Sequence, residues 1–195
     1  MHLQANNFKS CYIENLGKGK FAIYPLPAIA QMSPAFGMIA DDFNNDGNLD
    51  VTICGNDFGN EVSNGRYDGM NGLVLFGDGK GSFNPQTILQ SGIFLPGNAK
   101  ALVKLRGDDN NYLIAASQNR GPLELFEKKK SGQNILLKAN DKIIFIHLKN
   151  GKTRKEEVYH GNSFLSQSSL FISVNNTVKS IEIINNKNER RTINF

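Results

Sequence analysis

Residues 42–50 read Asp-Phe-Asn-Asn-Asp-Gly-Asn-Leu-Asp, and this nonapeptide decides how the rest of the chain is interpreted. Side-chain oxygens fall at its positions one, three, five and nine, with glycine at position six. Calcium takes six to eight oxygen ligands at roughly 2.3–2.6 Å, and a short loop supplies them when alternate side chains point inward. Gly47 permits the sharp turn, because glycine takes positive φ without a Cβ clash. The candidate calcium ligands are the side chains of Asp42, Asn44, Asp46 and Asp50 and the backbone carbonyl of Asn48.

The residues after this loop distinguish it from an EF-hand. An EF-hand loop ends in a bidentate Glu at position twelve and lies between two helices. Position twelve here is Ile53, inside the apolar run Val51-Thr52-Ile53-Cys54. We therefore expect the loop to lead directly into a β-strand.

Composition favours a turn-rich β-protein. The chain has 195 residues, enough for one large domain or two small ones, with 19 Gly, 6 Pro and no Trp. No segment approaches the roughly 18 apolar residues of a transmembrane helix. Residues 1–7 lack the charged start and apolar run of a signal peptide. Two interpretations stay open: a cytosolic protein, or part of a longer, secreted chain.

Cysteine and histidine usage predicts neither a disulfide framework nor a zinc site. Cys11 and Cys54 are the only cysteines in the sequence, and both occupy apolar, strand-like contexts. We expect buried free thiols, with a disulfide between the two as the alternative. The histidines, at positions 2, 147 and 160, are scattered without metal-ligand spacing.

Charge divides the chain into two parts. Residues 1–127 carry 9 basic and 13 acidic side chains, a net charge of −4. Residues 128–195 carry 13 basic and 5 acidic side chains, a net charge of +8. This contrast indicates two units with different surfaces. Nucleic acid or an anionic surface would suit the basic unit, although a solvated basic β-domain is the commoner explanation.

A phrase of the sequence recurs and indicates repeated blades. Residues 10–24 predict a strand, a glycine-containing turn and a second strand, and residues 73–83 repeat this order. Superposing residues 19–21 on 81–83 gives an offset of 62 residues. Such self-similarity in a strand-rich chain is typical of a β-propeller. Predicted strands at 36–40 and 50–55 flank the calcium loop. A weakened copy has strands at 101–105, 112–116 and 123–126, and residues 106–111 replace its metal loop, so we expect no tight calcium there.

Residues 56–72 form the longest connection between predicted strands. The segment exceeds the roughly 12–15 residues usual for a structureless loop, and binding residues often lie on such loops. Its candidate ligand-binding residues are Asn56, Glu61, Arg66, Tyr67 and Asp68. The alternative is a surface loop that packs on itself, with Arg66 paired to Asp68 or Glu61.

The texture of the sequence changes after residues 128–132, which read as a charged linker ending in glycine. Short strands are predicted at 142–148, 156–159, 170–174 and 178–184, with a last strand ending at residue 195. Asn150-Gly151 is a strong hairpin signal. Ile181 and Ile183 share one face of their strand. Residues 133–195 are thus expected to form a small antiparallel β-domain with one apolar side.

Two family resemblances follow from these motifs. The calcium loop, flanked by Gly-Lys-Gly-Lys-Phe (17–21) and Phe-Gly-Asp-Gly-Lys-Gly-Ser-Phe (76–83), resembles FG-GAP/VCBS repeats, which build the integrin-alpha type of β-propeller. Residues 161–169, Gly-Asn-Ser-Phe-Leu-Ser-Gln-Ser-Ser, followed by residues 178–183, are similar to the ASPIC/UnbV domain of cartilage acidic protein-like (CRTAC) proteins. The resemblance implies an all-β chain: about two C-terminal propeller blades and the end of another over 1–127, a linker over 128–132, and an ASPIC/UnbV-like domain over 133–195.

The resemblance also implies a function. It points to a non-catalytic, calcium-binding module at the cell surface or outside the cell, with a protein or glycan ligand and further propeller blades in the same protein. Two alternatives remain. Carboxylates of the 56–72 loop, Asp57, Glu61 and Asp68, would serve a glycan-active enzyme if suitably spaced. The basic C-terminal unit would serve a nucleic-acid-binding protein.

Overall fold

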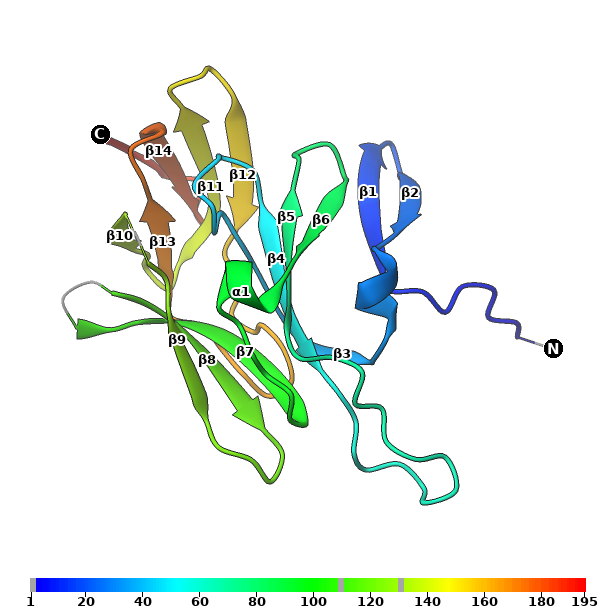
Figure 1. The fold of residues 1–195 in the computed structure, drawn as a ribbon. Helices are drawn as coiled ribbons and strands as arrows, with labels where there is room; N and C mark the ends of the chain where they lie inside the picture. The colour runs from blue at the N-terminus through cyan, green and yellow to red at the C-terminus, as the bar shows by residue number, and fades with distance from the viewer. Residues whose placement is uncertain (1–2, 109–110, 130–131) are drawn as a thin grey trace.

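The chain folds into antiparallel β-sheets with short helical turns between them (Figure 1). The structure, a computed structural model, describes residues 3–108, 111–129 and 132–195. These residues form five open antiparallel sheets, which confirms the prediction of an all-β protein. The strands are β1 Cys11–Gly17, β2 Lys20–Pro25, β3 Ala35–Asp41, β4 Asp50–Gly55, β5 Leu73–Gly77, β6 Phe83–Gln86, β7 Ala99–Arg106, β8 Tyr112–Gln118, β9 Glu124–Glu127, β10 Gln133–Leu136, β11 Asp141–Leu148, β12 Thr153–Glu157, β13 Phe171–Val174, β14 Val178–Asn185 and β15 Arg190–Asn194. The helical turns are η1 Ala28–Gln31 and α1 Ile88–Ser91.

The first unit contains the sheets of residues 3–127. Strands β3, β4, β5 and β6 pair in sequential order, β7, β8 and β9 do the same, and β1 pairs with β2. The calcium-loop candidate connects β3 to β4, and residues 56–72 connect β4 to β5. The two larger sheets share one core, in which Cys54, Leu102 and Tyr112 are fully buried.

Strands β3 and β7 approach each other so closely that only glycine fits between them. A Cβ on Gly37 in β3 would lie 2.6 Å from the amide nitrogen of Leu102 in β7 and 2.7 Å from the Cys54 sulfur. Burial in this contact raises the pKa of the Cys54 thiol to about 11. Cys54 and Cys11 are free thiols, as predicted, although Cys11 is only partly buried.

The second unit is built on one sheet with the strand order β12, β11, β14, β15, and a β10–β13 pair packs beside it. Its core surrounds Ile146, Ile181 and Ile183, so the predicted shared face of Ile181 and Ile183 is confirmed. The predicted Asn150-Gly151 turn joins β11 to β12, with Gly151 at φ +85°.

The two units interlock rather than sit apart. Phe171 in β13 is buried in the core of the first unit, where its ring packs edge-on against Tyr112 at a centroid distance of 5.2 Å. Asn162 donates hydrogen bonds from its side-chain nitrogen to the carbonyls of Met38 in β3 and Leu102 in β7. The second unit therefore bridges both large sheets of the first.

Residues 161–169 run along the free edge of β7. Because β7 pairs only with β8 in its sheet, alternate amides of β7 point away from the sheet. Serine hydroxyls accept hydrogen bonds from these amides. The pairs are Leu102 with Ser163 at 3.3 Å, Lys104 with Ser168 at 3.0 Å and Arg106 with Ser169 at 3.4 Å.

A few local predictions need correction. The strand expected over 156–159 instead spans Thr153 to Glu157, because the tight turn at Asn150-Gly151 lets pairing with β11 begin at Thr153, and this pairing ends at Glu157. Strand β10 and both helical turns were not predicted. The predicted turn over 106–111 and the predicted linker over 128–132 lie partly outside the described residues. Among the described residues, no helix has the length and apolar character needed to cross a membrane.

Candidate metal centre

The loop between β3 and β4 is held in a tight turn by its own amides. The Asp42 carboxylate accepts hydrogen bonds from the amides of Asp46 and Gly47, both at 3.0 Å. The side-chain oxygen of Asn44 also accepts from the Asp46 amide, and the Asp46 carboxylate accepts from the Asn48 amide at 2.7 Å. Gly47 has φ +90°, which is the conformation that the sequence predicted. The first three candidate ligands therefore lie within one turn.

Asp50, the last candidate ligand, is fully buried at the start of β4. One of its oxygens accepts hydrogen bonds from the amides of Phe43 and Asn44, and the other accepts from the amide of Gly77 in β5 at 3.0 Å. Burial raises the pKa of Asp50 to about 6, and the nearby charge of Asp46 adds to this effect, although the three amides oppose it. A nearby cation would stabilise the ionised form of this carboxylate.

Asn48 and the carboxylates differ in what they offer a metal. The Asn48 side-chain oxygen lies 2.4 Å from the position that a Cβ on Gly79 would take, so it faces the β5–β6 turn. Only the backbone carbonyl of Asn48 is then left as a possible metal ligand. An ionised carboxylate accepts about four hydrogen bonds, and Asp42 and Asp46 each accept two, so both keep acceptor capacity. Across residues 3–108, 111–129 and 132–195, no three Asp, Glu, His or Cys side chains converge as a ready-made metal cluster.

The second unit contacts this loop directly. Arg154 in β12 donates a hydrogen bond from Nη1 to the Gly47 carbonyl at 2.9 Å, and the same nitrogen lies 3.6 Å from Oδ2 of Asp42. Asn175 donates from its side-chain nitrogen to the side-chain oxygen of Asn45 at 3.0 Å. The candidate metal loop is therefore also a contact between the two units.

A buried ionic cluster lies beside the loop. The Asp41 carboxylate at the end of β3 accepts hydrogen bonds from the Tyr112 hydroxyl at 2.9 Å and from the Lys104 amine at 3.3 Å. Burial opposes its ionisation, but the charges of Lys104 and Lys128 and the Tyr112 hydrogen bond together lower its pKa. Lys128 donates from Nζ to the Asp42 backbone carbonyl.

The charges at this junction do not balance. Burial raises the pKa of Glu156, although Arg154 pairs with it at 2.9 Å and partly offsets the effect. The largely buried carboxylates are Asp41, Asp42, Asp50 and Glu156, and the cations among them are Lys104, Lys128 and Arg154. Among the described residues the cluster thus has four carboxyl groups and three cationic side chains, and Asp46 adds a fifth carboxyl group. Additional positive charge at this junction would be stabilising.

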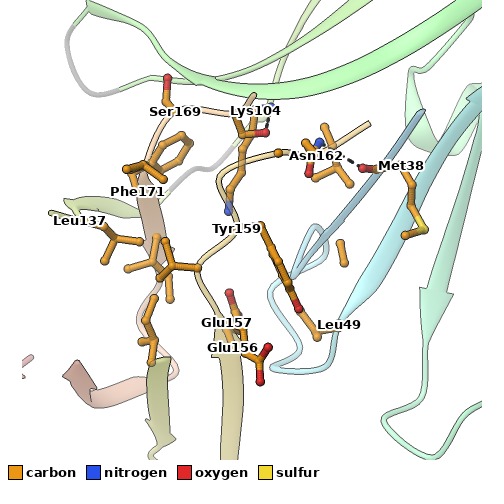
Figure 2. Close-up of a pocket in the computed structure, with 18 of the residues that line it drawn as sticks. Met38, Leu49, Lys104, Leu137, Glu156, Glu157, Tyr159, Asn162, Ser169 and Phe171 are labelled. Carbon is orange, nitrogen blue, oxygen red and sulfur yellow. Dashed lines mark hydrogen bonds between the residues drawn. The ribbon is translucent and has the colours of Figure 1, made fainter. Parts of the chain in front are cut away.

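A cleft of about 540 Å³ opens on the other side of this cluster, between the two units (Figure 2). Figure 2 shows the Lys104 side chain reaching into it toward Tyr159, with Phe171 and Leu137 on one side and Leu49 on the other. Its size falls in the range of small-ligand pockets, which often form between domains. No motif in the sequence predicted this cleft.

Asn56, a predicted ligand-binding residue, is a buried structural residue instead. Its side-chain nitrogen donates to the carbonyls of Met70 at 2.6 Å, Gly97 at 3.0 Å and Pro96 at 3.2 Å. Its oxygen accepts from the Met70 amide and the Ser33 hydroxyl. Because every polar atom of the side chain is engaged and the residue is fully buried, Asn56 is removed from the ligand-binding set.

The other predicted ligand-binding residues lie on the exposed part of the 56–72 loop. Tyr67 pairs through its backbone with Asp57, which narrows the loop at its base. The Arg66 guanidinium lies 5.1 Å from the centroid of the Phe58 ring, a contact that the sequence did not predict. The exposed members of the set are Glu61, Arg66, Tyr67 and Asp68.

Sequence reasoning missed the residues that approach the metal loop from far along the chain. Arg154 stands 107 residues from Gly47, and no local pattern links the two. The apolar run before Asp41 was the one local signal, because a carboxylate that is buried at a strand end needs a charged or hydrogen-bonding partner. No protein-family model matches this sequence, and no curated protein matches it either.

Proposed function

We propose that this protein is a non-catalytic calcium-binding module whose metal site is the loop from Asp42 to Asp50. The excess of buried carboxylates around a loop with oxygens at alternate positions carries the proposal. Bound calcium would stabilise the ionised form of these carboxylates and hold the β3–β4 connection in place. The residues that would hold it are the side chains of Asp42, Asn44, Asp46 and Asp50 and the carbonyl of Asn48.

The larger architecture that we propose is a set of FG-GAP/VCBS-type propeller blades followed by an ASPIC/UnbV-like domain. Three features support it. Strands β3 to β6 pair in sequential order, the first strands of successive sheets approach closely at Gly37, and a hairpin followed by a helical turn occurs twice, as β1–β2–η1 and β5–β6–α1. The exposed Ile13, Phe21 and Ile23 on one face of the β1–β2 hairpin support a further blade packing there.

The biological role that we propose is binding of a protein or glycan ligand at the cell surface or outside the cell. The exposed part of the 56–72 loop and the cleft between the units are the candidate contact surfaces. In this proposal calcium fixes the β3–β4 connection, and exposed residues of the 56–72 loop contact the ligand.

Calcium titration tests the metal proposal. Extracellular calcium modules bind with dissociation constants of about 10⁻⁴–10⁻³ M, and calcium at a hundred times the dissociation constant stabilises a fold by ~2.7 kcal/mol. We expect a chelator to lower the melting temperature of the wild type and of the control Asp78→Ala, whose carboxylate is exposed in the β5–β6 turn. Asp46→Ala should lose this response. Equal melting of the wild type with and without chelator, together with no binding heat at millimolar calcium, would contradict the proposal.

A further inference from the structure

Arg154 is fixed between two carboxylates at the junction. Its Nη1 atom contacts the Gly47 carbonyl and faces Asp42, while Nε donates to Glu156 at 3.0 Å. The side chain is only 13% exposed, so solvent screens its charge weakly. A calcium ion on Asp42 would therefore lie close to a second, immobile positive charge.

The hairpin that carries Arg154 also packs on the turn of the loop. The Leu148 side chain, at the end of β11, lies 2.7 Å from where a Gly47 Cβ would stand, so it fills the space over the glycine. Asn175, in the turn between β13 and β14, donates a side-chain hydrogen bond to Asn45 of the loop. Any rearrangement of the loop around a metal is thus transmitted to the β11–β12 hairpin.

We propose that Arg154 sets the calcium affinity of the loop and couples metal binding to the contact between the two units. This inference rests on the proposed calcium function. The guanidinium and the metal attract the same carboxylate of Asp42 and repel each other, so each weakens the binding of the other. By thermodynamic linkage, the factor by which Arg154 lowers calcium affinity equals the factor by which calcium weakens the Arg154 contact.

Isothermal titration calorimetry with calcium on three variants tests the affinity. Arg154→Gln removes the charge but keeps an amide donor, and we expect it to bind calcium about tenfold more tightly than the wild type. Arg154→Lys keeps the positive charge beside Asp42, although not the forked contacts, and should stay within about threefold of the wild type. The matched control is Lys155→Gln, which removes the same charge from the adjacent residue, whose exposed side chain pairs with Glu157.

The outcomes separate the two proposals. Equal or weaker calcium binding by Arg154→Gln, with normal binding by the wild type, would overturn the role of Arg154 and leave the calcium site standing. No calcium binding by any of these proteins would instead refute the metal site, and this inference with it.

A second measurement, by NMR on the wild type, does not require Arg154→Gln to fold. In the wild type, the Nε–Hε resonance of Arg154 should shift on calcium saturation, because the Asp42 contact weakens, whereas that of exposed Arg190 should not. If Arg154→Gln does not fold, the resonance is assigned from Arg154→Lys. An unchanged Arg154 resonance at saturating calcium would exclude the coupling.

Discussion

Replacing Phe171 by alanine should destabilise both units at once. The residue lies in β13 of the second unit, yet it is 1% exposed inside the core of the first. Truncating a buried Phe costs ~3–5 kcal/mol, and the lost edge-on contact with Tyr112 contributes ~0.5–1.5 kcal/mol. The Lys104 ammonium, 5.3 Å from the same ring, also loses a favourable contact. We expect the unfolding free energy to fall by ~4 kcal/mol, a large fraction of the ~5–15 kcal/mol typical of folded proteins.

Urea unfolding followed by circular dichroism measures this loss. We expect Phe171→Ala to unfold at lower urea and in two resolved steps, because the side chain that β13 inserts into the core of the first unit is gone. Phe164→Ala is the matched control. Its side chain is 60% exposed, so its unfolding free energy should stay within ~0.5 kcal/mol of the wild type. A loss below ~1 kcal/mol for Phe171→Ala, with a single transition, would refute the view that the two cores depend on each other.

Two further predictions concern buried polar groups. Burial opposes ionisation of Asp141, but hydrogen bonds from Arg191 and the Lys138 amide lower its pKa below the usual value. The ionised Asp141 carboxylate therefore stabilises the fold above about pH 4, and this contribution is lost as the pH falls through the lowered pKa of Asp141. Asp141→Asn lacks this contribution, so its unfolding free energy should fall less steeply with acid than that of the wild type. Asn56→Ala leaves the backbone carbonyls and the amide that bind this side chain without a hydrogen-bond partner, and it places alanine at φ +81°. Urea unfolding should therefore show a fall of ~3 kcal/mol in the unfolding free energy. The control Asn64→Ala, at an exposed residue, should leave the unfolding free energy unchanged.

Local patterns predicted the features that depend on neighbouring residues in the chain. Short apolar runs bounded by turn residues predicted most strands, and β4 and β5 are buried on both faces as such runs allow. The spacing of oxygen-bearing side chains around Gly47 predicted a tight turn between two strands, and the structure has that turn. The Asn150-Gly151 pair predicted the β11–β12 hairpin.

The remaining features depend on contacts between distant segments. From the sequence, Asn56 was predicted to be an exposed ligand-binding residue. It is buried because distant segments around Ser33, Met70 and Gly97 surround it, and no local pattern shows this. Nothing in the local sequence distinguishes Arg154 from an exposed cation on a strand, because its position beside Asp42 depends on the whole fold. Phe171 belongs to one unit by sequence and to the other by packing. Such residues acquire their roles only when the whole chain is assembled.

The serines along β7 set an order of events during synthesis. The hydroxyls that bind the amides of Leu102, Lys104 and Arg106 lie 61 to 64 residues later in the chain. At a translation rate of about 5–20 residues per second, the edge of β7 stays open for roughly 3–13 seconds after it leaves the ribosome. During that interval it offers a template for strand addition by a neighbouring chain. The segment 161–169 ends this exposure without itself becoming a strand, so a protein truncated before it should aggregate through the uncovered edge of β7.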